Sequence, residues 1–368
     1  MKIAMVSPGR DNYSETFIKA QKDGLHDVLF FYDGEIPKQL EGYGKLVEAP
    51  KVYLYKIKRL LGINALTDAE QGFKEALKIH KAQVIITHFG PTAVKVLDVC
   101  QLLDLPLIAH FHGYDASMFR ILEEYNNAYK EVFKYAHSII SVSNDMTEAL
   151  IALGCPKNKI VYNPCTPDPD FLEIKPFYES NNILAVGRFT EKKGPQTSVK
   201  AFASLCLKYP NAQLIMIGDG PEIMECRALV EGLGLENRIL FKGALPKRDI
   251  MDWMSKSRAF IQHSVTAKNG DKEGTPVAIL EAGLAGLPVI STRHAGIKDV
   301  VKHNETGLLC EENDLLAYTK NLDTIMASSR LAMELGQNAK NYIYNNFNRK
   351  NQLQKLEKLL LSACMDAI

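Results

Sequence analysis

The chain has 368 residues, of which 46% are hydrophobic and 24% charged, so it is long enough for two domains with full cores. Its formal net charge of +1 argues against a general nucleic-acid binder, which would show a strong basic excess. Seven scattered cysteines, never in a C-x-x-C pair, indicate neither a disulfide framework nor a zinc site, and they favour a reducing cytosol.

The N-terminal sequence MKIAMVSPGR reads as a short buried strand rather than a signal peptide, because its apolar run is only a few residues long. No apolar stretch approaches the roughly 20 residues that span a bilayer. We therefore expect a cytoplasmic protein that does not cross a membrane and that touches one, if at all, peripherally on the inner face of the plasma membrane.

Residues 51–66 form the best candidate for a membrane or lipid contact. On a helical wheel five apolar residues share one face, and the basic residues lie off it: Tyr53, Leu54, Ile57, Leu60 and Leu61. This pattern is typical of an interfacial amphipathic helix. The alternative is that the apolar face packs on a sheet and the cations are solvated.

Short apolar runs alternate along the chain with longer stretches of helical spacing. In the first half the runs are 3–8, 27–34, 83–90, 106–113, 138–144 and 159–164, and in the second half they are 183–189, 212–220, 238–243, 259–264 and 287–292. Continuous apolar strands that alternate with helices predict parallel sheets covered on both faces. The Pro- and Asp-rich segment 164–176 divides the two series, which therefore predict two Rossmann-like domains.

Two glutamates, Glu273 and Glu281, stand eight residues apart around an expected helix start. Thr275 is the expected N-cap and Pro276 the first helical residue, which puts Glu273 in the loop and Glu281 on the helix. Exposed amides and the helix dipole make such a start an anion site. A sugar joined to a nucleotide by a diphosphate fits this arrangement.

The segment around these glutamates, with GLPVIST and HAGI after it, resembles the Glu-x7-Glu signature of the retaining glycosyltransferases of family 4. The wording is similar to that of the bacterial exopolysaccharide, colanic-acid-type branch. Further motifs of that branch follow one another in order: SETFI (14–18), THFG (87–90), FHGYD (111–115), SVS (141–143), YNP (162–164), VGR with EKKG (186–194) and GDGP (218–221).

The resemblance implies a GT-B fold, an α/β architecture in which two Rossmann-like domains with parallel sheets face each other across a cleft. It places an N-terminal acceptor-side domain at 1–170, with a C-terminal helix at about 347–368 packing back on it, and a nucleotide-sugar-binding domain at 171–346. It implies a hexosyltransferase that uses a UDP-sugar, or alternatively a GDP-sugar, with a glycan or lipid-linked saccharide as acceptor. No metal and no further cofactor are expected.

The same resemblance assigns the donor diphosphate to two cations, Arg188 at a strand end and Lys193 in the next loop. Proteins stabilise such a leaving group with a metal or with fixed cations and dipoles, and the sequence offers no convincing cluster of metal-binding carboxylates. The alternative for Arg188 and Lys193 is a solvated pair of surface cations.

Glu281 is expected to accept hydrogen bonds from the ribose hydroxyls. Glu273, with the amides of Gly274 and Thr275, is expected to face the donor sugar and phosphates. The alternative is a helix-capping acid and a core salt bridge.

His112 follows a strand and precedes Gly113, whose missing side chain would let a ligand approach closely. The resemblance implies that His112 contacts the donor sugar or phosphate near the reacting carbon and that Asp115 closes the motif. We expect His88 and His110 to be structural, tied to the backbone at strand ends.

Gly187 of VGR and Gly218 of GDGP are assigned to the nucleotide site. GDGP is better explained as a tight strand-to-helix turn that borders the base than as a phosphate clamp, and it is not the G-x-G-x-x-G of dinucleotide enzymes. Two other functions stay open: a nucleotide-sugar epimerase on the same fold, and a catalytically silent nucleotide-sugar-binding subunit.

Overall fold

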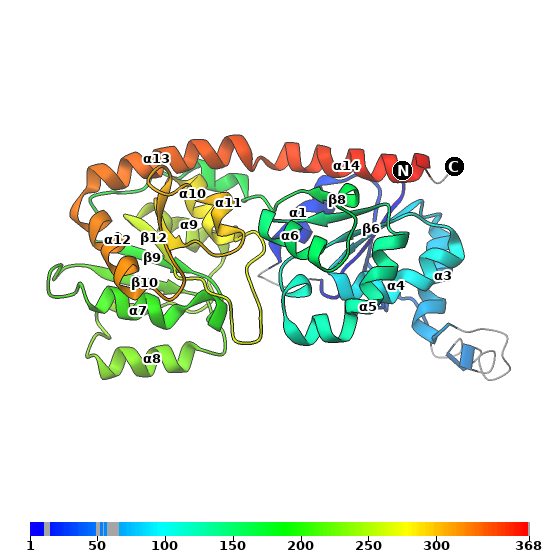
Figure 1. Ribbon diagram of the computed structural model, residues 1–368, viewed down its shortest axis with the longest axis horizontal. Coiled ribbons are helices and arrows are strands. Elements are labelled where there is room, and N and C mark those ends of the chain that lie inside the picture. The colour runs from blue at the N-terminus through cyan, green and yellow to red at the C-terminus, as the bar shows by residue number, and fades with distance from the viewer. Residues whose placement is uncertain (11–14, 49–51, 54, 57–65, 367–368) are drawn as a thin grey trace. The chain divides into compact units, whose positions relative to one another are not determined.

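The computed structural model describes residues 1–10, 15–48, 52–53, 55–56 and 66–366, and the chain divides into two compact units (Figure 1). Unit 1 comprises Met1–Asn163 and Gln352–Ile368, and unit 2 comprises Pro164–Asn351. Most of the candidate membrane segment 51–66 lies outside the described residues, so its proposed helix stays a prediction.

Unit 1 is built on an eight-stranded sheet with the order β4-β3-β2-β1-β5-β6-β7-β8. Its strands are β1 (Ile3–Val6), β2 (Val28–Tyr32), β3 (Gln39–Leu40), β4 (Gly44–Lys45), β5 (Val84–His88), β6 (Leu107–His110), β7 (Ser138–Ser141) and β8 (Ile160–Tyr162). From β2 to β8 neighbouring strands are parallel, whereas β3 and β4 pair antiparallel at one edge. This short antiparallel edge was not expected.

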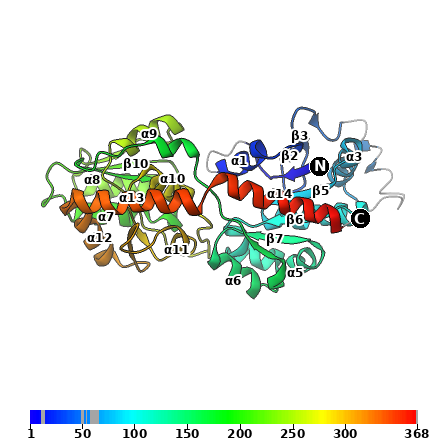
Figure 2. The ribbon, with the colours of Figure 1, turned by 90° about the horizontal axis from the view of Figure 1, so that it is seen from above.

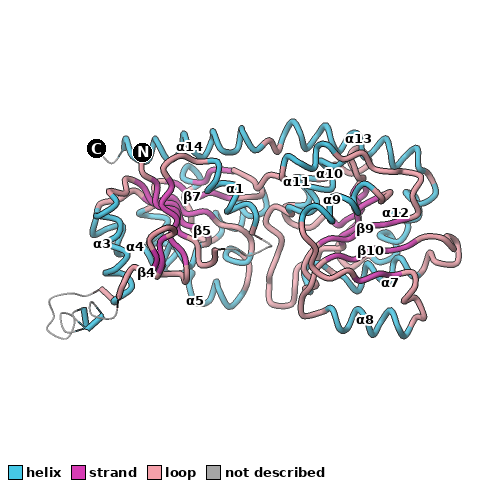
Figure 3. Tube along the Cα trace, turned by 180° about the vertical axis from the view of Figure 1, so that it is seen from behind, coloured by secondary structure: helices cyan, strands magenta, loops and turns pink. Residues whose placement is uncertain are grey.

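Helices cover both faces of the unit 1 sheet, and Figure 3 distinguishes these helices from the strands by colour. They are α1 (Thr16–Gly24), α3 (Asp68–His80), α4 (Gly90–Leu103), α5 (Phe119–Tyr135), α6 (Asn144–Ala152) and α14 (Arg349–Asp366), with short 3-10 turns η1 (Tyr114–Ala116) and η2 (Lys157–Lys159). Successive residues of β2 point to opposite faces, since Phe30 packs in the cluster of α1 and α14 while Phe31 meets Phe73 of α3 edge-on.

The C-terminal helix α14 completes the core of unit 1. Leu356, Leu360 and Ala363 are buried in one cluster with Ile3 of β1 and Ile86 of β5. Figure 2 shows α14 lying over the strands of this unit. Residues from opposite ends of the chain therefore share one hydrophobic core.

Unit 2 has a six-stranded parallel sheet with the order β11-β10-β9-β12-β13-β14. The strands are β9 (Asn182–Val186), β10 (Gln213–Ile217), β11 (Ile239–Phe241), β12 (Ala259–Gln262), β13 (Val289–Thr292) and β14 (Gly307–Cys310). The helices are α7 (Pro195–Ala203), α8 (Ile223–Gly232), α9 (Lys247–Ser255), α10 (Val277–Ala285), α11 (Ile297–Val300), α12 (Leu315–Ala327) and α13 (Ser329–Asn346), with 3-10 turns η3 (Pro169–Glu173) and η4 (Glu191–Lys193).

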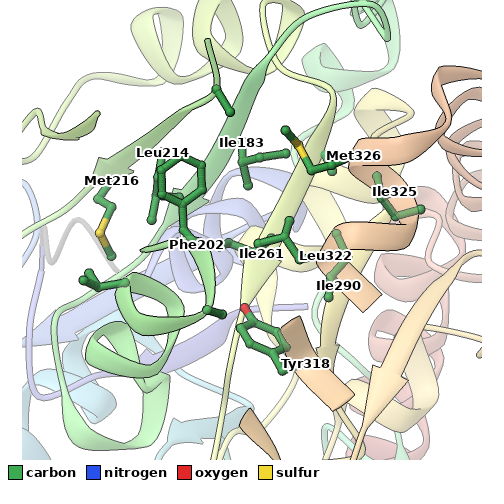
Figure 4. Packing of buried hydrophobic residues seen from close by; sticks show 14 of the residues in the cluster. Ile183, Phe202, Leu214, Met216, Ile261, Ile290, Tyr318, Leu322, Ile325 and Met326 are labelled. Atoms are coloured by element: carbon green, nitrogen blue, oxygen red, sulfur yellow. The ribbon is translucent and has the colours of Figure 1, made fainter. Parts of the chain in front are cut away.

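Two hydrophobic clusters lie on the two faces of this sheet. One packs α7, α8 and α12 on the strands, and Figure 4 shows Phe202 and Tyr318 within it. The other packs α9, α10 and α11 on the opposite face. Burial on both faces explains why the strands read as continuous apolar runs in the sequence.

Each of the eleven apolar runs overlaps a strand, and the strand order places a switch point in each sheet. The order reverses between β1 and β5 in unit 1 and between β9 and β12 in unit 2. Ligands of open parallel sheets bind beyond the carboxyl ends of the strands at such points. Within the described ranges, none of the helices is long and apolar enough to traverse a bilayer.

Candidate functional site

A pocket opens at the switch point of unit 2. Its lining includes Gly187 and Arg188 after β9, Lys193 at the end of η4, and Gln262 at the end of β12. Arg188 is exposed, and within the described residues it has no ion-pair partner. The fold therefore brings the two predicted cations to the edge of the sheet where a ligand is expected.

Lys193 and Glu273 form a buried ion pair with an Nζ–Oε1 distance of 2.9 Å and side-chain exposures of only 15% and 7%. Burial alone would raise the pKa of Glu273, but Lys193 and Lys192 outweigh it and hold the pKa at about 2. Burial lowers the pKa of Lys193, and Glu273 opposes that shift. The salt-bridge alternative for Glu273 is thus realised, and its cation lines the pocket.

His294, which belongs to the HAGI motif and had no predicted role, binds the backbone of Glu273. The Glu273 backbone N–H donates to His294 Nε2 at 3.1 Å, so the ring hydrogen belongs on Nδ1, which donates to Glu312 Oε1 at 2.6 Å. The Ser264 hydroxyl also donates to Glu273 Oε1 at 3.4 Å. The position of this histidine just beyond a predicted strand end was the sequence signal that could have revealed this series of hydrogen bonds.

Lys192, the neighbour of Lys193, anchors the loop before the glutamate. Its ammonium lies 3.0 Å from Asp271 Oδ1 and donates to the Lys272 carbonyl at 3.3 Å. Two consecutive lysines therefore bind two parts of one loop, and this leaves Arg188 as the exposed cation among the three.

The start of α10 differs from the prediction. The helix begins at Val277 with Pro276 as N-cap and without a side-chain cap, whereas the Thr275 hydroxyl accepts a hydrogen bond from the Cys165 N–H at 3.2 Å. Thr275 is therefore used to fasten the segment that enters unit 2. Glu273 lies in the loop and Glu281 on the helix, as predicted.

Glu281 is half-buried and lies among a separate set of groups. Burial and the nearby Asp168 carboxylate raise its pKa to about 8, although the Asp168 amide, Arg349 and Lys247 act in the opposite direction. The two glutamates thus have opposite protonation preferences. Only Glu273 is a fixed anion at neutral pH.

The predicted glycines of unit 2 have different surroundings. Gly187 lines the pocket, and Gly274 is buried between Glu273 and Thr275. Gly218 has a φ of +135°, and a Cβ there would collide with the Gly187 carbonyl oxygen. Its glycine is explained by this crossing of two backbones, in agreement with a tight strand-to-helix turn.

The predicted histidine motif lies in unit 1. The carboxylate of buried Asp115 accepts hydrogen bonds from the backbone N–H groups of Gly90, His112 and Gly113 at 2.8–3.2 Å. Gly113 has a φ of +154°, which few other residues adopt. Asp115 therefore fixes the backbone that carries His112, and burial raises the Asp115 pKa to about 6 despite these donors.

The prediction that His88 and His110 are tied to the backbone was wrong. The His88 Nδ1 atom lies 3.0 Å from His112 Nε2, within hydrogen-bond distance. His110 is buried, and in the described part of the chain neither of its ring nitrogens has a hydrogen-bond partner. The backbone groups at these strand ends are used by the parallel sheet, which leaves the rings to one another.

The fold is that of known GT-B glycosyltransferases. The chain aligns with crystal structures of HepE from Anabaena, solved with UDP, at a TM-score of 0.79 and 18% identity over 98% of this chain and 100% of the other. It also aligns with the sucrose-phosphate synthase of Thermosynechococcus elongatus at a TM-score of 0.75 and 20% identity, over 98% of each chain. At such low identity these matches define the fold class alone.

The sequence matches two family descriptions, "Glycosyltransferase Family 4" over residues 11–171 and "Glycosyl transferases group 1" over residues 170–342. Together the two descriptions cover residues 11–342, and the chain belongs to the glycosyltransferases that they describe.

Among curated relatives, the chain is 31% identical over 247 residues to the putative colanic acid biosynthesis glycosyltransferase WcaL of Escherichia coli, covering 66% of this chain and 61% of the relative. It is 31% identical over 241 residues to the amylovoran biosynthesis glycosyltransferase AmsK of Erwinia amylovora, covering 64% and 59%. The matches thus span about three fifths of the length of these relatives.

Proposed function

We propose that this chain is a retaining hexosyltransferase that moves a hexose from a nucleotide diphosphate sugar to a glycan or lipid-linked saccharide in cell-surface polysaccharide biosynthesis. The names of its relatives, which concern colanic acid and amylovoran, support the pathway. UDP-sugar is the proposed donor, since the HepE structures hold UDP or UDP-glucose. GDP-sugar is the alternative, since a more distant relative is named as GDP-mannose-dependent.

The observation that carries this proposal is the pocket at the β9–β12 switch point, with Arg188 and Lys193 in its lining. The leaving nucleoside diphosphate gains negative charge as its bond to the sugar breaks. At about 4 Å and an effective dielectric constant near 20, one cation attracts one such charge by roughly 4 kcal/mol. Lys193 would contribute less than Arg188, because Glu273 lies 2.9 Å from its ammonium and offsets part of its charge, so the two cations would supply only part of the ~8 kcal/mol of barrier lowering that is the low end for enzymes.

We propose that these fixed cations bear the diphosphate charge without a divalent metal. Lys193 is held in place by Glu273, so it is oriented before the donor arrives. Such preorganisation is what makes electrostatic stabilisation effective in an active site. The N-terminus of α10, which has no side-chain cap, would add backbone N–H groups and the positive end of its dipole beside Gly274 and Thr275.

Glu281 is the proposed ribose contact. A pKa of about 8 keeps its carboxyl largely protonated at neutral pH, so it can both donate to and accept from hydroxyl groups. This modifies the sequence-based expectation, in which Glu281 only accepts hydrogen bonds. A neutral carboxyl also avoids placing another negative charge near the donor phosphates.

His112 is the proposed contact to the donor sugar near the reacting carbon. Burial holds its pKa well below the usual range, with smaller effects of His110 and His88, so the imidazole is neutral. A neutral ring offers one hydrogen-bond donor and one acceptor to sugar hydroxyls without adding charge. The proposed reaction proceeds through an oxocarbenium-like transition state with departure and attack on the same face.

The proposal includes a cytoplasmic protein bound peripherally at the inner face of the membrane, where a lipid-linked acceptor would be found. Segment 51–66 is proposed for this contact on its sequence pattern alone. Its test is flotation of the full chain with anionic vesicles, compared with a variant in which Lys51, Lys58 and Arg59 are replaced by glutamine.

The proposal is tested by thermal unfolding in the presence of UDP, GDP, ADP and their sugar conjugates, with and without EDTA. A ligand at 100 times its dissociation constant stabilises the folded state by about 2.7 kcal/mol. We expect a shift with one nucleotide family that EDTA does not remove. A shift that EDTA abolishes would overturn the metal-free part, and no shift with any nucleotide would overturn the donor site.

A further inference from the structure

Three histidines meet at the carboxyl edge of the unit 1 sheet. His88 ends β5, His110 ends β6, and His112 follows two residues later. In the sheet register His88 and His110 are direct partners, which places both side chains on the same face. One ring nitrogen of each histidine lies within 4.8 Å of one from each of the other two.

This cluster leaves polar atoms buried without partners. His88 Nε2, both ring nitrogens of His110, and His112 Nδ1 make no hydrogen bond to any described residue. Leaving a buried donor or acceptor without a partner is energetically unfavourable. Buried polar groups in native proteins are normally satisfied by the protein, by water or by a bound ion. Plain side-chain packing therefore does not account for three such rings together.

The chemistry of the three rings suits a metal ion. A neutral imidazole has a free lone pair and is the commonest protein ligand of transition metals. The surrounding rings of Phe17 and Phe89, 4.5 and 4.9 Å from His112 between centroids, shield the cluster.

The backbone under the cluster is fixed in advance. His88 and His110 are held by paired strands, and Asp115 accepts the His112 amide hydrogen bond at 3.0 Å. Zinc binds imidazole nitrogen at about 2.0–2.1 Å, so tetrahedral ligands stand about 3.4 Å apart. Side-chain rotations that move these nitrogens by about 1 Å would therefore bring them from within 4.8 Å of one another to that spacing.

We propose that His88, His110 and His112 form a binding site for one divalent transition-metal ion of the Zn²⁺ class. Three histidines leave the fourth tetrahedral position open, which is the arrangement of reactive rather than structural zinc sites. The site does not depend on the proposed transferase function. If that function holds, a bound metal occupies His112 and competes with its contact to the donor sugar.

The test uses the full chain without a polyhistidine tag, stripped with EDTA and then dialysed. Co²⁺ is titrated in while its visible d–d absorption is followed, and Zn²⁺ is then added to displace it. We expect one Co²⁺ per chain, a tetrahedral-type spectrum, and complete displacement by Zn²⁺. Because this readout needs no sugar nucleotide, its failure is distinguishable from failure of the proposed transferase activity.

Two variants and one control locate the ion. His110→Ala and His112→Ala should each weaken Co²⁺ binding by at least about 100-fold, the upper range for loss of groups that only support a ligand. His112 is only half-buried, so its variant is expected to fold, which circular dichroism checks. His26→Ala, at an exposed position, should bind as the wild type does. Absence of a one-to-one site, or equal binding by all four proteins, overturns the proposal.

Discussion

The two units carry polar clusters at the same edge of their sheets, yet the clusters are of opposite electrostatic kinds. In unit 2 the Lys193 ammonium and the Glu273 carboxylate are charged and bonded to each other. In unit 1 the three histidines are neutral, and most of their ring nitrogens have no partner in the described residues. Equivalent positions in two Rossmann-like units can therefore hold clusters of different charge, because local pairing decides the charge of each cluster.

A second contrast lies within unit 2. Glu273 and Glu281 are the same residue type eight positions apart, but cations surround the first and burial dominates the second. Their pKa values of about 2 and about 8 lie on either side of the usual 4.5. Spacing alone could therefore not reveal their protonation states.

Removal of the Lys193 charge should have the largest effect. In Lys193→Ala the buried Glu273 carboxylate loses its partner, so the free energy of unfolding should fall by roughly 3–5 kcal/mol. Turnover should fall by roughly 10²- to 10³-fold, as for other losses of one preorganised group. Urea unfolding and donor-dependent turnover measure the two effects.

The double variant Lys193→Ala/Glu273→Gln separates stability from catalysis. Without a buried charge it should recover much of the lost stability while its turnover stays low. If turnover returned together with stability, Lys193 would be a structural residue and its proposed role at the diphosphate would be wrong.

Arg188→Ala should affect activity without affecting the fold. Arg188 is exposed and has no ion-pair partner in the described residues, so its replacement should change the free energy of unfolding by less than about 0.5 kcal/mol. Turnover should still fall by roughly 10²- to 10³-fold. Arg188→Lys should also be impaired if the guanidinium binds phosphate with two N–H groups. Turnover within threefold of wild type in both variants would contradict this role.

His294→Ala should have a smaller, structural effect. It removes the acceptor for the Glu273 N–H and the donor to Glu312, and an unsatisfied buried group costs about 1–3 kcal/mol. Urea unfolding should show this loss of stability. The KM for the sugar nucleotide should rise, because the loop that holds Glu273 is less ordered. An unchanged midpoint and KM would show that the hydrogen-bonded chain is unimportant.

The two glutamates should change the pH dependence of stability in opposite directions. Because the pKa of Glu281 is raised, its contribution to the free energy of unfolding falls as the pH rises from about 4.5 to about 8. The stability of Glu281→Gln relative to wild type should therefore increase over this range. The lowered pKa of Glu273 means that its ionised carboxylate stabilises the fold above about pH 4.5 and that this stabilisation is lost as the pH falls toward about 2. Glu273→Gln should therefore lose the most free energy of unfolding, relative to wild type, above pH 4.5. Urea titrations at several pH values would contradict the assignment if both variants showed the same slope.

The fold could be predicted because both sheets are buried on two faces, and each buried strand leaves an apolar run in the sequence. The two-residue strands β3 and β4 and the strand β14 were missed, since two residues give no pattern and β14 follows directly on a polar turn. Loop placement of Glu273 and helical placement of Glu281 were correct. The assigned roles of the site residues stay predictions.

Contacts between distant segments could not be predicted. Thr275 bonds to Cys165 instead of capping its own helix, and His294 bonds to Glu273 across 21 residues. The pairing of His88 with His112 depends on the order of β5 and β6 in the sheet. Local spacing reports helix and strand periodicity, but these partners are set by topology.

Calorimetric titration of wild type and Arg188→Ala with UDP and with uridine, all in EDTA, tests directly whether fixed cations bind the diphosphate. We expect wild type to prefer UDP to uridine strongly. Arg188→Ala should lose at least about tenfold in UDP affinity, or about 1.4 kcal/mol, while its uridine affinity stays equal to that of wild type. Equal UDP affinity in the two proteins, or no UDP binding without metal, would contradict a diphosphate site built from fixed cations.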